Sequence, residues 1–340
     1  MKNRRVLIWL VPLILLLLLV PFLVPSALPY AGAEEAGLPV YTPVELENPN
    51  PDPLPIPNPK EKAAAVYAPD PAGYVYDDAT QAAWEYRDGT ISVRIETRTI
   101  RNTKVLFTWI QIADPKQLQT GVTRYDTPPD KWTRQIKAIA AINGDWYSGR
   151  KEGRVFRNGV ELRNEKWGNY DALIIDDQGD FHILYRPDEN AFAPYEGHIL
   201  QSFVFGPAMV IDGVLQEYDN NNYGSGPGMG LQNKTQRQAL CQMDKLSYLI
   251  LTTEGPNESK DGGFTMEEFA KLAYDVGAKN AYNMDGGSSA TLILNNTKMN
   301  RFGKGGMRPI YDLVYFVTAE KAPEPTPTPE PVTEEGTPEP

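Results

Sequence analysis

An acid and two glycines interrupt an apolar stretch near the C-terminal end of the chain, in NAYNMDGGSSATLIL, residues 280–294. Because glycine allows positive φ and a close approach of the backbone, Asp285, Gly286 and Gly287 predict a tight turn between two apolar segments. A functional interpretation stands beside this one. The backbone N–H groups of residues 286–289 could form a nest that binds an anion next to a fixed carboxylate.

Two other segments place polar residues at the ends of expected strands, where binding sites are often built. In AINGDWYSG, residues 141–149, an apolar strand runs into Asn143, Gly144 and Asp145. With the two aromatic residues that follow, these side chains could hold a sugar, although a plain Asn-Gly turn over core aromatics fits equally well. In KTQRQALCQ, Arg237 fits either an exposed side chain on a strand face or a guanidinium clamp for phosphate.

Short strands dominate the part of the chain that must position these residues. ISVRIETRTI (91–100) alternates in polarity, KVLFTWIQIA (104–113) is rich in β-formers, and IKAIAAIN (136–143) is continuously apolar. Turn signals between further apolar segments predict hairpins at Asn158-Gly159, near Gly179, at Asp212-Gly213 and at Asp244-Lys245.

One helix is clear, in GFTMEEFAKLAYDVGAKNA. Thr265 and Glu268 match a capping box, apolar residues follow at helical spacing, and Gly277 is a natural stop. A weaker helix, which begins at Thr127 and Pro128, precedes the strand predicted at residues 136–143. The sequence therefore predicts an α+β fold, a sheet-dominated mixed α/β domain with a strand–helix–strand passage near its C-terminus.

The two ends of the chain differ from its middle. Residues 6–24 are apolar throughout and follow three basic residues, so residues 1–33 are predicted as a signal peptide or an N-terminal membrane anchor. Residues 34–66 are a proline-rich linker without strand ladders, and residues 321–340 are a disordered tail rich in Pro, Glu and Thr. Residues 67–320 remain as the folded domain, with an expected extracytoplasmic location, either anchored to the membrane or secreted.

Charge and composition exclude several classes of function. The formal net charge is −11 and there is no basic block, which argues against nucleic acid as a partner. Cys241 is the single cysteine, so there is no internal disulfide. The two histidines, His182 and His198, do not have the spacing of metal ligands, and neither a metal site nor a cofactor is predicted.

Several motifs occur in the order found in one enzyme family. They are AAINGDWYS, the lone Arg237 before a strand pair, GGFTMEEFAKLAYDVGAKNAYNMDGGSSATL and MRPIYDLVYFV. Over residues 136–318 the chain resembles the phosphodiester glycosidases, most specifically where the capped helix leads into Asn-x-Asp-Gly-Gly-Ser-Ser. The resemblance implies a mixed α/β protein that hydrolyses the bond between an anomeric carbon and a phosphodiester, releasing the sugar and leaving a phosphomonoester.

The resemblance also implies which residues bind the substrate. Those that match the motifs of the family are Asn143, Gly144, Arg237, Thr265, Asn283, Gly286, Gly287, Ser288 and Arg308. The chain departs from the family at Asp145 and Trp146, where Gly and Phe are common, and at Ser288-Ser289, where a third glycine is common. These departures leave the shape of the substrate open.

Cleavage of an anomeric C–O bond passes through an oxocarbenium-like state and needs a carboxylate near the anomeric carbon. Asp285 is the first candidate, as nucleophile or base, while Glu254 and Asp145 are candidates for a second carboxylate. Glu268 fits a catalytic acid and a capping residue equally well. Phosphate is already a fair leaving group, so a group that holds its charge, such as Arg237, could contribute more than a general acid.

The leading hypothesis is an exported hydrolase that acts on glycosyl-1-phosphodiesters of a cell-surface or extracellular glycopolymer. Its partners would be a phosphorylated glycan and, through the N-terminal segment, the membrane. A non-catalytic glycan-binding module of the cell envelope is an alternative, but it would not need a carboxylate beside a phosphate. An ordinary glycosidase, with two facing carboxylates, is another. The sugar, its anomeric configuration and assistance by a divalent cation stay open.

Overall fold

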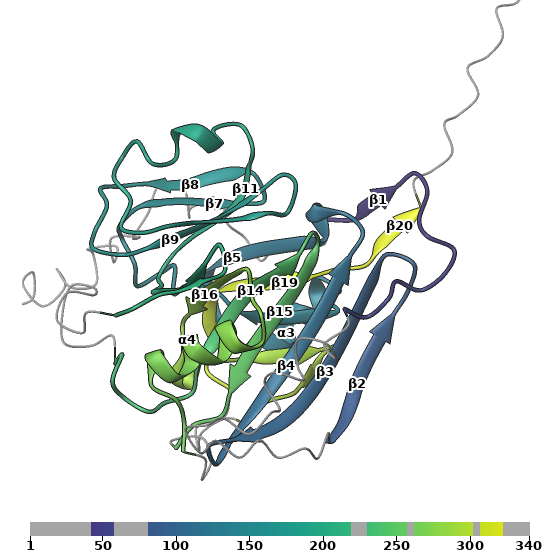
Figure 1. Ribbon diagram of the computed structural model, residues 1–340. Helices are drawn as coiled ribbons and strands as arrows, with labels where there is room; N and C mark the ends of the chain where they lie inside the picture. The colour runs from purple at the N-terminus through teal and green to yellow at the C-terminus, as the bar shows by residue number, and fades with distance from the viewer. Residues whose placement is uncertain (1–41, 58–80, 219–229, 257–261, 302–306, 322–340) are drawn as a thin grey trace, which may run out of the picture.

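The computed structural model describes residues 42–57, 81–218, 230–256, 262–301 and 307–321 of the chain (Figure 1). The apolar segment predicted as a signal peptide or anchor lies outside these ranges, as does the expected tail after its first residue. Within them, no helix is both long enough and apolar enough to cross a membrane.

The largest element is an antiparallel sheet of eight strands. Its strands, in spatial order, are β13 (Val214–Leu215), β12 (Ala208–Ile211), β16 (Asn280–Met284), β14 (Gln238–Asp244), β15 (Ser247–Thr253), β4 (Thr103–Ile112), β3 (Ile91–Ile100) and β2 (Gln81–Arg87). The predicted strands 91–100 and 104–113 are confirmed as β3 and β4. The turns predicted at Asp212-Gly213 and Asp244-Lys245 are confirmed between β12 and β13 and between β14 and β15.

A second antiparallel sheet has five strands. They are β18 (Thr297–Lys298), β17 (Leu292–Leu294), β6 (Ala140–Asn143), β19 (Ile310–Phe316) and β5 (Leu118–Thr127). The expected helix after Pro128 is confirmed as α3 (Pro129–Gln135), and Trp132 packs it on the outer face of this sheet. The helix cap at Ile136 and the positive φ of Lys137, 53°, explain why β6 begins at residue 140 rather than at 136.

The two sheets pack face to face through one hydrophobic cluster. Leu240, Ile250 and Tyr282 of the eight-stranded sheet contribute to it, together with Ile142 and Val314 of the five-stranded sheet. Every residue of β15 is buried, because its alternate side chains enter two different cores. This arrangement explains why the central strands read as continuous apolar runs.

The other face of the large sheet is covered by α4 (Met266–Asp275), as Figure 1 shows. The predicted capping box is confirmed: Thr265 Oγ1 accepts from the N–H of Glu268 at 3.2 Å, and Glu268 Oε2 accepts from the N–H of Thr265 at 3.0 Å. The chain then enters β16, so the predicted passage from strand to helix to strand is present. Sheets dominate the described residues, and the α+β class is confirmed.

Five further strands form two smaller sheets on one side of the molecule (Figure 1). They are β9 (Ala172–Asp176), β10 (Phe181–Leu184) and β11 (Ile199–Val204), which pair with one another, and the hairpin of β7 (Arg154–Arg157) and β8 (Val160–Asn164). The turns predicted at Asn158-Gly159 and near Gly179 are confirmed. Short 3-10 helices are η2 (Pro115–Gln117), η3 (Ala193–Tyr195) and η4 (Gly287–Ser289).

Part of the expected proline-rich linker is packed on the domain. β1 (Val44–Leu46) pairs in parallel with β20 (Ala319–Lys321), and the N–H of Leu54 donates to Asp88 O at 2.9 Å. The prediction that this segment forms no strand ladder is therefore wrong for residues 44–46. The three residues of β1 lie between prolines and keep all their N–H groups, so they can pair like any short edge strand.

Candidate functional site

Two strands from different sheets end side by side, and their following segments bind each other. β6 ends at Asn143, and Asp285 is the first residue after the end of β16. Asn143 Nδ2 donates a hydrogen bond to Asp285 O at 2.6 Å. Asn143 Oδ1 accepts from the N–H of Thr291 at 3.0 Å, and the N–H of Asp285 donates to Gly144 O at 3.3 Å. The buried Asn143 side chain thus fixes both ends of the loop after β16. The structure supports a positioning task for Asn143.

A cavity of about 720 Å³ opens where these segments meet. Among the described residues that line it, the one carboxylate is Asp285, and four side chains are cationic: Arg150, Lys234, Arg237 and Arg308. A cavity with this excess of positive charge favours an anionic ligand.

Asp285 lies in this cavity with part of its surface exposed. Burial raises the pKa of Asp285 above its ordinary value, while a hydrogen bond from Ser289 and the positive charge of Arg308 oppose that rise. Arg308 Nη1 in turn donates to Ser289 Oγ at 2.9 Å. A carboxylate in this setting is a stronger base than an exposed aspartate.

The two glycines after Asp285 serve different purposes. Gly286 has an ordinary φ of −119°, but a Cβ there would lie 2.8 Å from Gln236 O, so the close approach requires glycine. The positive φ, 57°, belongs to Gly287. The N–H of Gly287 donates to Gln236 O at 2.8 Å and that of Ser289 to Gly286 O at 3.1 Å. The expected anion nest is not formed by these two N–H groups, which protein carbonyls already occupy.

Arg237 lines the cavity but is largely committed to the backbone. Its Nε donates to Phe264 O at 3.1 Å, and its Nη2 donates to Gly230 O at 2.7 Å and to Asn233 O at 2.8 Å. Burial lowers the pKa of Arg237 to about 10, so the guanidinium stays charged at neutral pH. The expectation of a guanidinium fork for phosphate is corrected in this respect: two of its three nitrogens hold the loop that forms one wall of the cavity.

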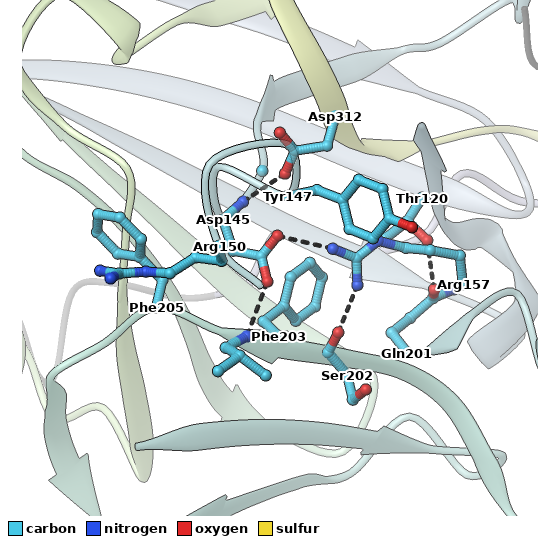
Figure 2. Close-up of polar contacts among 12 residues, drawn as sticks. Thr120, Asp145, Tyr147, Arg150, Arg157, Gln201, Ser202, Phe203, Phe205 and Asp312 are labelled. Atoms are coloured by element: carbon cyan, nitrogen blue, oxygen red, sulfur yellow. Dashed lines mark hydrogen bonds and ion pairs between the residues drawn. The ribbon is translucent and has the colours of Figure 1, made fainter. Parts of the chain in front are cut away.

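Arg150 was not singled out by the sequence motifs. A turn in which Trp146 O accepts from the N–H groups of Gly149 and Arg150, both at 3.0 Å, brings Trp146 and Arg150 to the cavity. The Arg150 guanidinium lies 3.8 Å from the ring centroid of Tyr170 and 4.9 Å from that of Phe205, which Figure 2 shows beside it. Such stacking fixes the direction of the charge. The basic residue that closes the aromatic segment DWYSGR is the signal that could have found it.

Asn283 is buried against the cavity with one polar atom left over. Its Nδ2 donates to Gly206 O at 2.8 Å, whereas its Oδ1 has no hydrogen-bond partner among the described residues. The side chain is 4% exposed and lines the cavity. A buried acceptor without a partner is unfavourable unless a ligand supplies the donor, so this atom fits a hydroxyl or amide N–H of a substrate.

Asp145, one expected second carboxylate, is instead fully buried beside the cavity wall. Arg157 Nη2 donates to its Oδ1 at 2.7 Å, and the N–H of Val204 donates to its Oδ2 at 2.7 Å (Figure 2). Burial alone would raise the pKa of Asp145, but the Arg157 charge and the Val204 N–H outweigh it and hold the pKa below its ordinary value. Asp145 is an ionised structural group and does not line the cavity.

Glu254 and Glu268 are likewise placed outside the cavity lining. Glu254 is fully buried, with Lys104 Nζ at 3.5 Å from one carboxylate oxygen and Arg301 Nε at 3.7 Å from the other. Glu268 closes the capping box and pairs with Arg101 and with Lys234 Nζ, the latter at 3.6 Å. Both carboxylates are paired with cations, and neither lines the cavity that holds Asp285.

The remaining expected residues fall into two groups. Thr265 serves as the N-cap of α4, and Ser288 is exposed; neither lines the cavity. Gly144 and Arg308 line a smaller adjoining cavity of about 110 Å³, which shares Asp285, Arg308 and Trp146 with the large one. Asp312 of β19 also lines the small cavity, although no sequence motif singled it out. Within the described ranges, no cluster of three His, Cys, Asp or Glu side chains could hold a metal ion.

Comparison with known proteins identifies the family. The phosphodiester glycosidase family model matches residues 137–317, more than half of the chain, and the chain belongs to this family. A curated relative, the SPbeta prophage-derived uncharacterized protein YomE of Bacillus subtilis (strain 168), is 23% identical over 203 residues. That match covers 58% of this chain and 31% of YomE, so the chain spans about a third of its relative.

Two solved structures share the fold. The catalytic domain of zebrafish N-acetylglucosamine-1-phosphodiester alpha-N-acetylglucosaminidase, auto-inhibited by its pro-peptide, matches with a TM-score of 0.51 and 16% identity, over 72% of this chain and 88% of that one. A hypothetical protein from Synechocystis matches with a TM-score of 0.54 and 15% identity, over 71% of this chain and 64% of that one. At these identities the likeness concerns the fold alone.

Proposed function

We propose that this protein hydrolyses the bond between the anomeric carbon of a sugar and a phosphodiester, releasing the sugar and leaving a phosphomonoester. The observation that carries the proposal is the composition of the cavity: Asp285 faces it together with four cationic side chains. A phosphodiester is an anion, and a carboxylate placed among cations can approach the sugar end of that anion without net repulsion. Membership of the phosphodiester glycosidase family supports the same reaction.

The four cationic residues have different roles in this proposal. Arg150 and Arg308 offer their charge to the phosphate, which becomes more negative as the C–O bond breaks and is then bound more strongly in the transition state than in the ground state. Lys234 adds a third charge on the opposite loop, whose shape Arg237 maintains. Arg150 is the best oriented of these groups because aromatic rings hold its guanidinium plane.

The sugar lies at the other end of the cavity in this account. Asp285 acts on the anomeric carbon as nucleophile, or as the base for the attacking water. Asn283 Oδ1 accepts a hydrogen bond from the sugar, and the exposed Trp146 ring offers an apolar face against which a sugar can stack. The reaction of an ordinary glycosidase does not require the four cationic side chains. We therefore prefer a phosphodiester as the substrate.

We place the activity outside the cytoplasm, on a cell-surface or extracellular glycopolymer. The apolar run of residues 6–24 after basic residues supports this location, since it has the features of an export signal or anchor. Fractionation of cells that express the full chain tests it: we expect the protein in the envelope or the medium, and recovery in the cytoplasm would contradict it.

The reaction is tested with defined diesters in water labelled with ¹⁸O. The first probe is the methyl phosphodiester of N-acetyl-α-glucosamine 1-phosphate, because the zebrafish protein of the same fold is named for such a bond. The corresponding diesters of glucose, galactose and mannose, in both anomers, complete the set. We expect release of one sugar with the label on its anomeric oxygen.

Label in methyl phosphate would show P–O cleavage and make the protein a phosphodiesterase of another kind. Binding of a diester without release of any sugar would favour a glycan-binding module instead.

Asn283→Leu, which removes the acceptor at similar volume, is expected to raise KM or lower kcat/KM by about 10-fold, the effect of one lost hydrogen bond of about 1.4 kcal/mol.

A further inference from the structure

The small cavity beside Asp285 holds a second carboxyl group, that of Asp312. Asp312 lies on β19 and is 4% exposed, while Asp285 lies in the loop after β16 and lines both cavities. Arg308 and Trp146 border both cavities as well. Asp285 therefore borders the cavity that Asp312 also lines.

The segment Asn143-Gly144-Asp145 is built around the Asp312 carboxyl group. The N–H of Gly144 donates to Asp312 O at 3.0 Å, and the N–H of Asp145 donates to Asp312 Oδ2 at 2.6 Å (Figure 2). A Cβ on residue 144 would lie 1.8 Å from Asp312 Oδ2, so glycine is the residue that admits the carboxyl group at this place. A backbone N–H thus fixes one oxygen of Asp312. Glycine is required at position 144 to leave space for this carboxyl group, and not only to form a turn.

The charges around Asp312 come from four elements. Asp145 and Asp285 are acidic neighbours from the loops after β6 and β16, whereas Arg157 of β7 and Arg308, just before β19, are basic. On β5, the residue paired with Asp312 is the uncharged Val122.

Arg157 is already engaged by the Asp145 carboxylate, at 2.7 Å. Burial and the nearby charge of Asp145 raise the pKa of Asp312 well above its ordinary value, and the Arg157 charge offsets only part of that rise. Asp312 therefore keeps its proton in a pH range where an exposed aspartate is ionised.

We propose that Asp312 is the proton donor of this site and that Asp145 is the residue that keeps the proton on it. The proposal rests on the proposed function. As the C1–O bond breaks, its electron pair stays on the phosphate oxygen and the Asp312 proton goes to that oxygen. Water supplies the oxygen that ends on C1, and the proton that the water releases restores the Asp312 carboxyl group. Two carboxyl groups with unequal proton affinity in one cavity are the arrangement that such acid and base roles require.

The test compares Asp312→Asn with the wild type on two substrates of the same sugar, the phosphodiester and the glycosyl fluoride. Asparagine is neutral, like the protonated carboxyl group, and its Oδ1 can accept from the N–H of Asp145. We expect diester turnover to fall roughly 10²–10⁴-fold, the range for loss of a general acid, and turnover of the fluoride to change by less than about 10-fold. Fluoride departs without needing the Asp312 proton.

The outcomes separate the two proposals. If the wild type releases no sugar from any diester of the set, the proposed function fails and this inference fails with it. If the wild type is active and Asp312→Asn turns over the diester within about threefold, only the role of Asp312 is overturned. Should Asp312→Asn fail to fold, the wild type decides alone: its diester rate must fall at alkaline pH through one ionisation that the fluoride rate does not show.

A readout without turnover completes the test. Because the folded protein raises the pKa of Asp312, its contribution to stability is fully present below the ordinary pKa of aspartate and is lost as pH rises through the raised value. The Tm of Asp312→Asn minus that of the wild type should therefore increase as pH increases. A Tm difference that stays constant from acidic to alkaline pH would contradict a protonated Asp312.

Discussion

Two acids follow two strands that end side by side, and their surroundings differ. Asp145 comes after β6 and Asp285 after β16, each with a glycine next to it. Asp145 turns into the interior, where Arg157 and the N–H of Val204 hold its charge and its pKa is lowered. Asp285 faces the cavity, where burial raises its pKa.

The difference shows that a carboxylate near a strand end is not by itself a catalytic group. What separates the two acids is the use of the surrounding donors. Around Asp145 the donors are aimed at the carboxylate, whereas the donors next to Asp285 are partly used elsewhere: the N–H of Gly287 binds Gln236 O. An acid whose charge is fully satisfied is a stabilising element, and one left partly unsatisfied is available to a substrate.

The largest expected effect on stability is that of Asp145→Asn. Removal of the charge leaves Arg157 buried without its partner, which should lower the free energy of unfolding by about 3–5 kcal/mol. Because the pKa of Asp145 is lowered in the folded protein, its contribution is present above the ordinary aspartate pKa and is lost as pH falls. Urea titrations at pH 7 and pH 3 measure both, and an equal loss at the two pH values would contradict the ion-pair account.

Gly144→Ala should have the next largest effect. The added methyl group must displace the Asp312 carboxyl group, so we expect a loss of about 1–3 kcal/mol, in the range for overpacking of a core, and a fall in diester turnover. The matched control is Gly287→Ala, where the nearest atom to a new Cβ is Thr235 Oγ1 at 3.8 Å. That variant bears the strain of φ 57° alone, about 1–2 kcal/mol. A larger loss for Gly287→Ala than for Gly144→Ala would contradict this ranking.

The smallest expected effect on stability is that of Asp285→Asn. With its pKa raised in the folded protein, Asp285 contributes stability below the ordinary aspartate pKa and loses it as pH rises through the raised value. The variant should therefore melt close to the wild type under acidic conditions and gain on it as pH rises. This dependence is opposite in sign to that of Asp145, and calorimetric scans of both variants across pH would show it. If the Tm of Asp145→Asn and that of Asp285→Asn changed with pH in the same direction relative to the wild type, the contrast between the two acids would be contradicted.

Local sequence patterns predicted much of the fold. The alternation in residues 91–100, the Asn158-Gly159 turn and the capping box of Thr265 and Glu268 depend on neighbours within a few residues, and each is present in the structure. The pairing of β1 with β20 joins residues more than 270 positions apart and has no local signal beyond three residues free of proline.

The site was predictable only in part. The Asp-Gly-Gly and Asn-Gly segments were found because their residue types are unusual in strands, and they do meet. Their partners were missed or misassigned: Arg150 is directed by rings brought together in space, and Arg237 is occupied by carbonyls of the loop just before it and by that of Phe264. Asp312 lies inside a regular strand, where nothing in the sequence distinguishes it from a residue that faces solvent.

The most direct test of the central claim is the turnover of a sugar-1-phosphodiester by the wild type and by Asp285→Asn at pH 7, with the melting of both measured in the same buffer. Asparagine keeps the size of the side chain and removes its charge, so a carboxylate that acts on the anomeric carbon predicts a fall of roughly 10³-fold, about 4 kcal/mol of transition-state stabilisation, with a Tm equal to or above that of the wild type. Full turnover by Asp285→Asn, on a diester that the wild type cleaves, would contradict the account and reduce Asp285 to a turn residue.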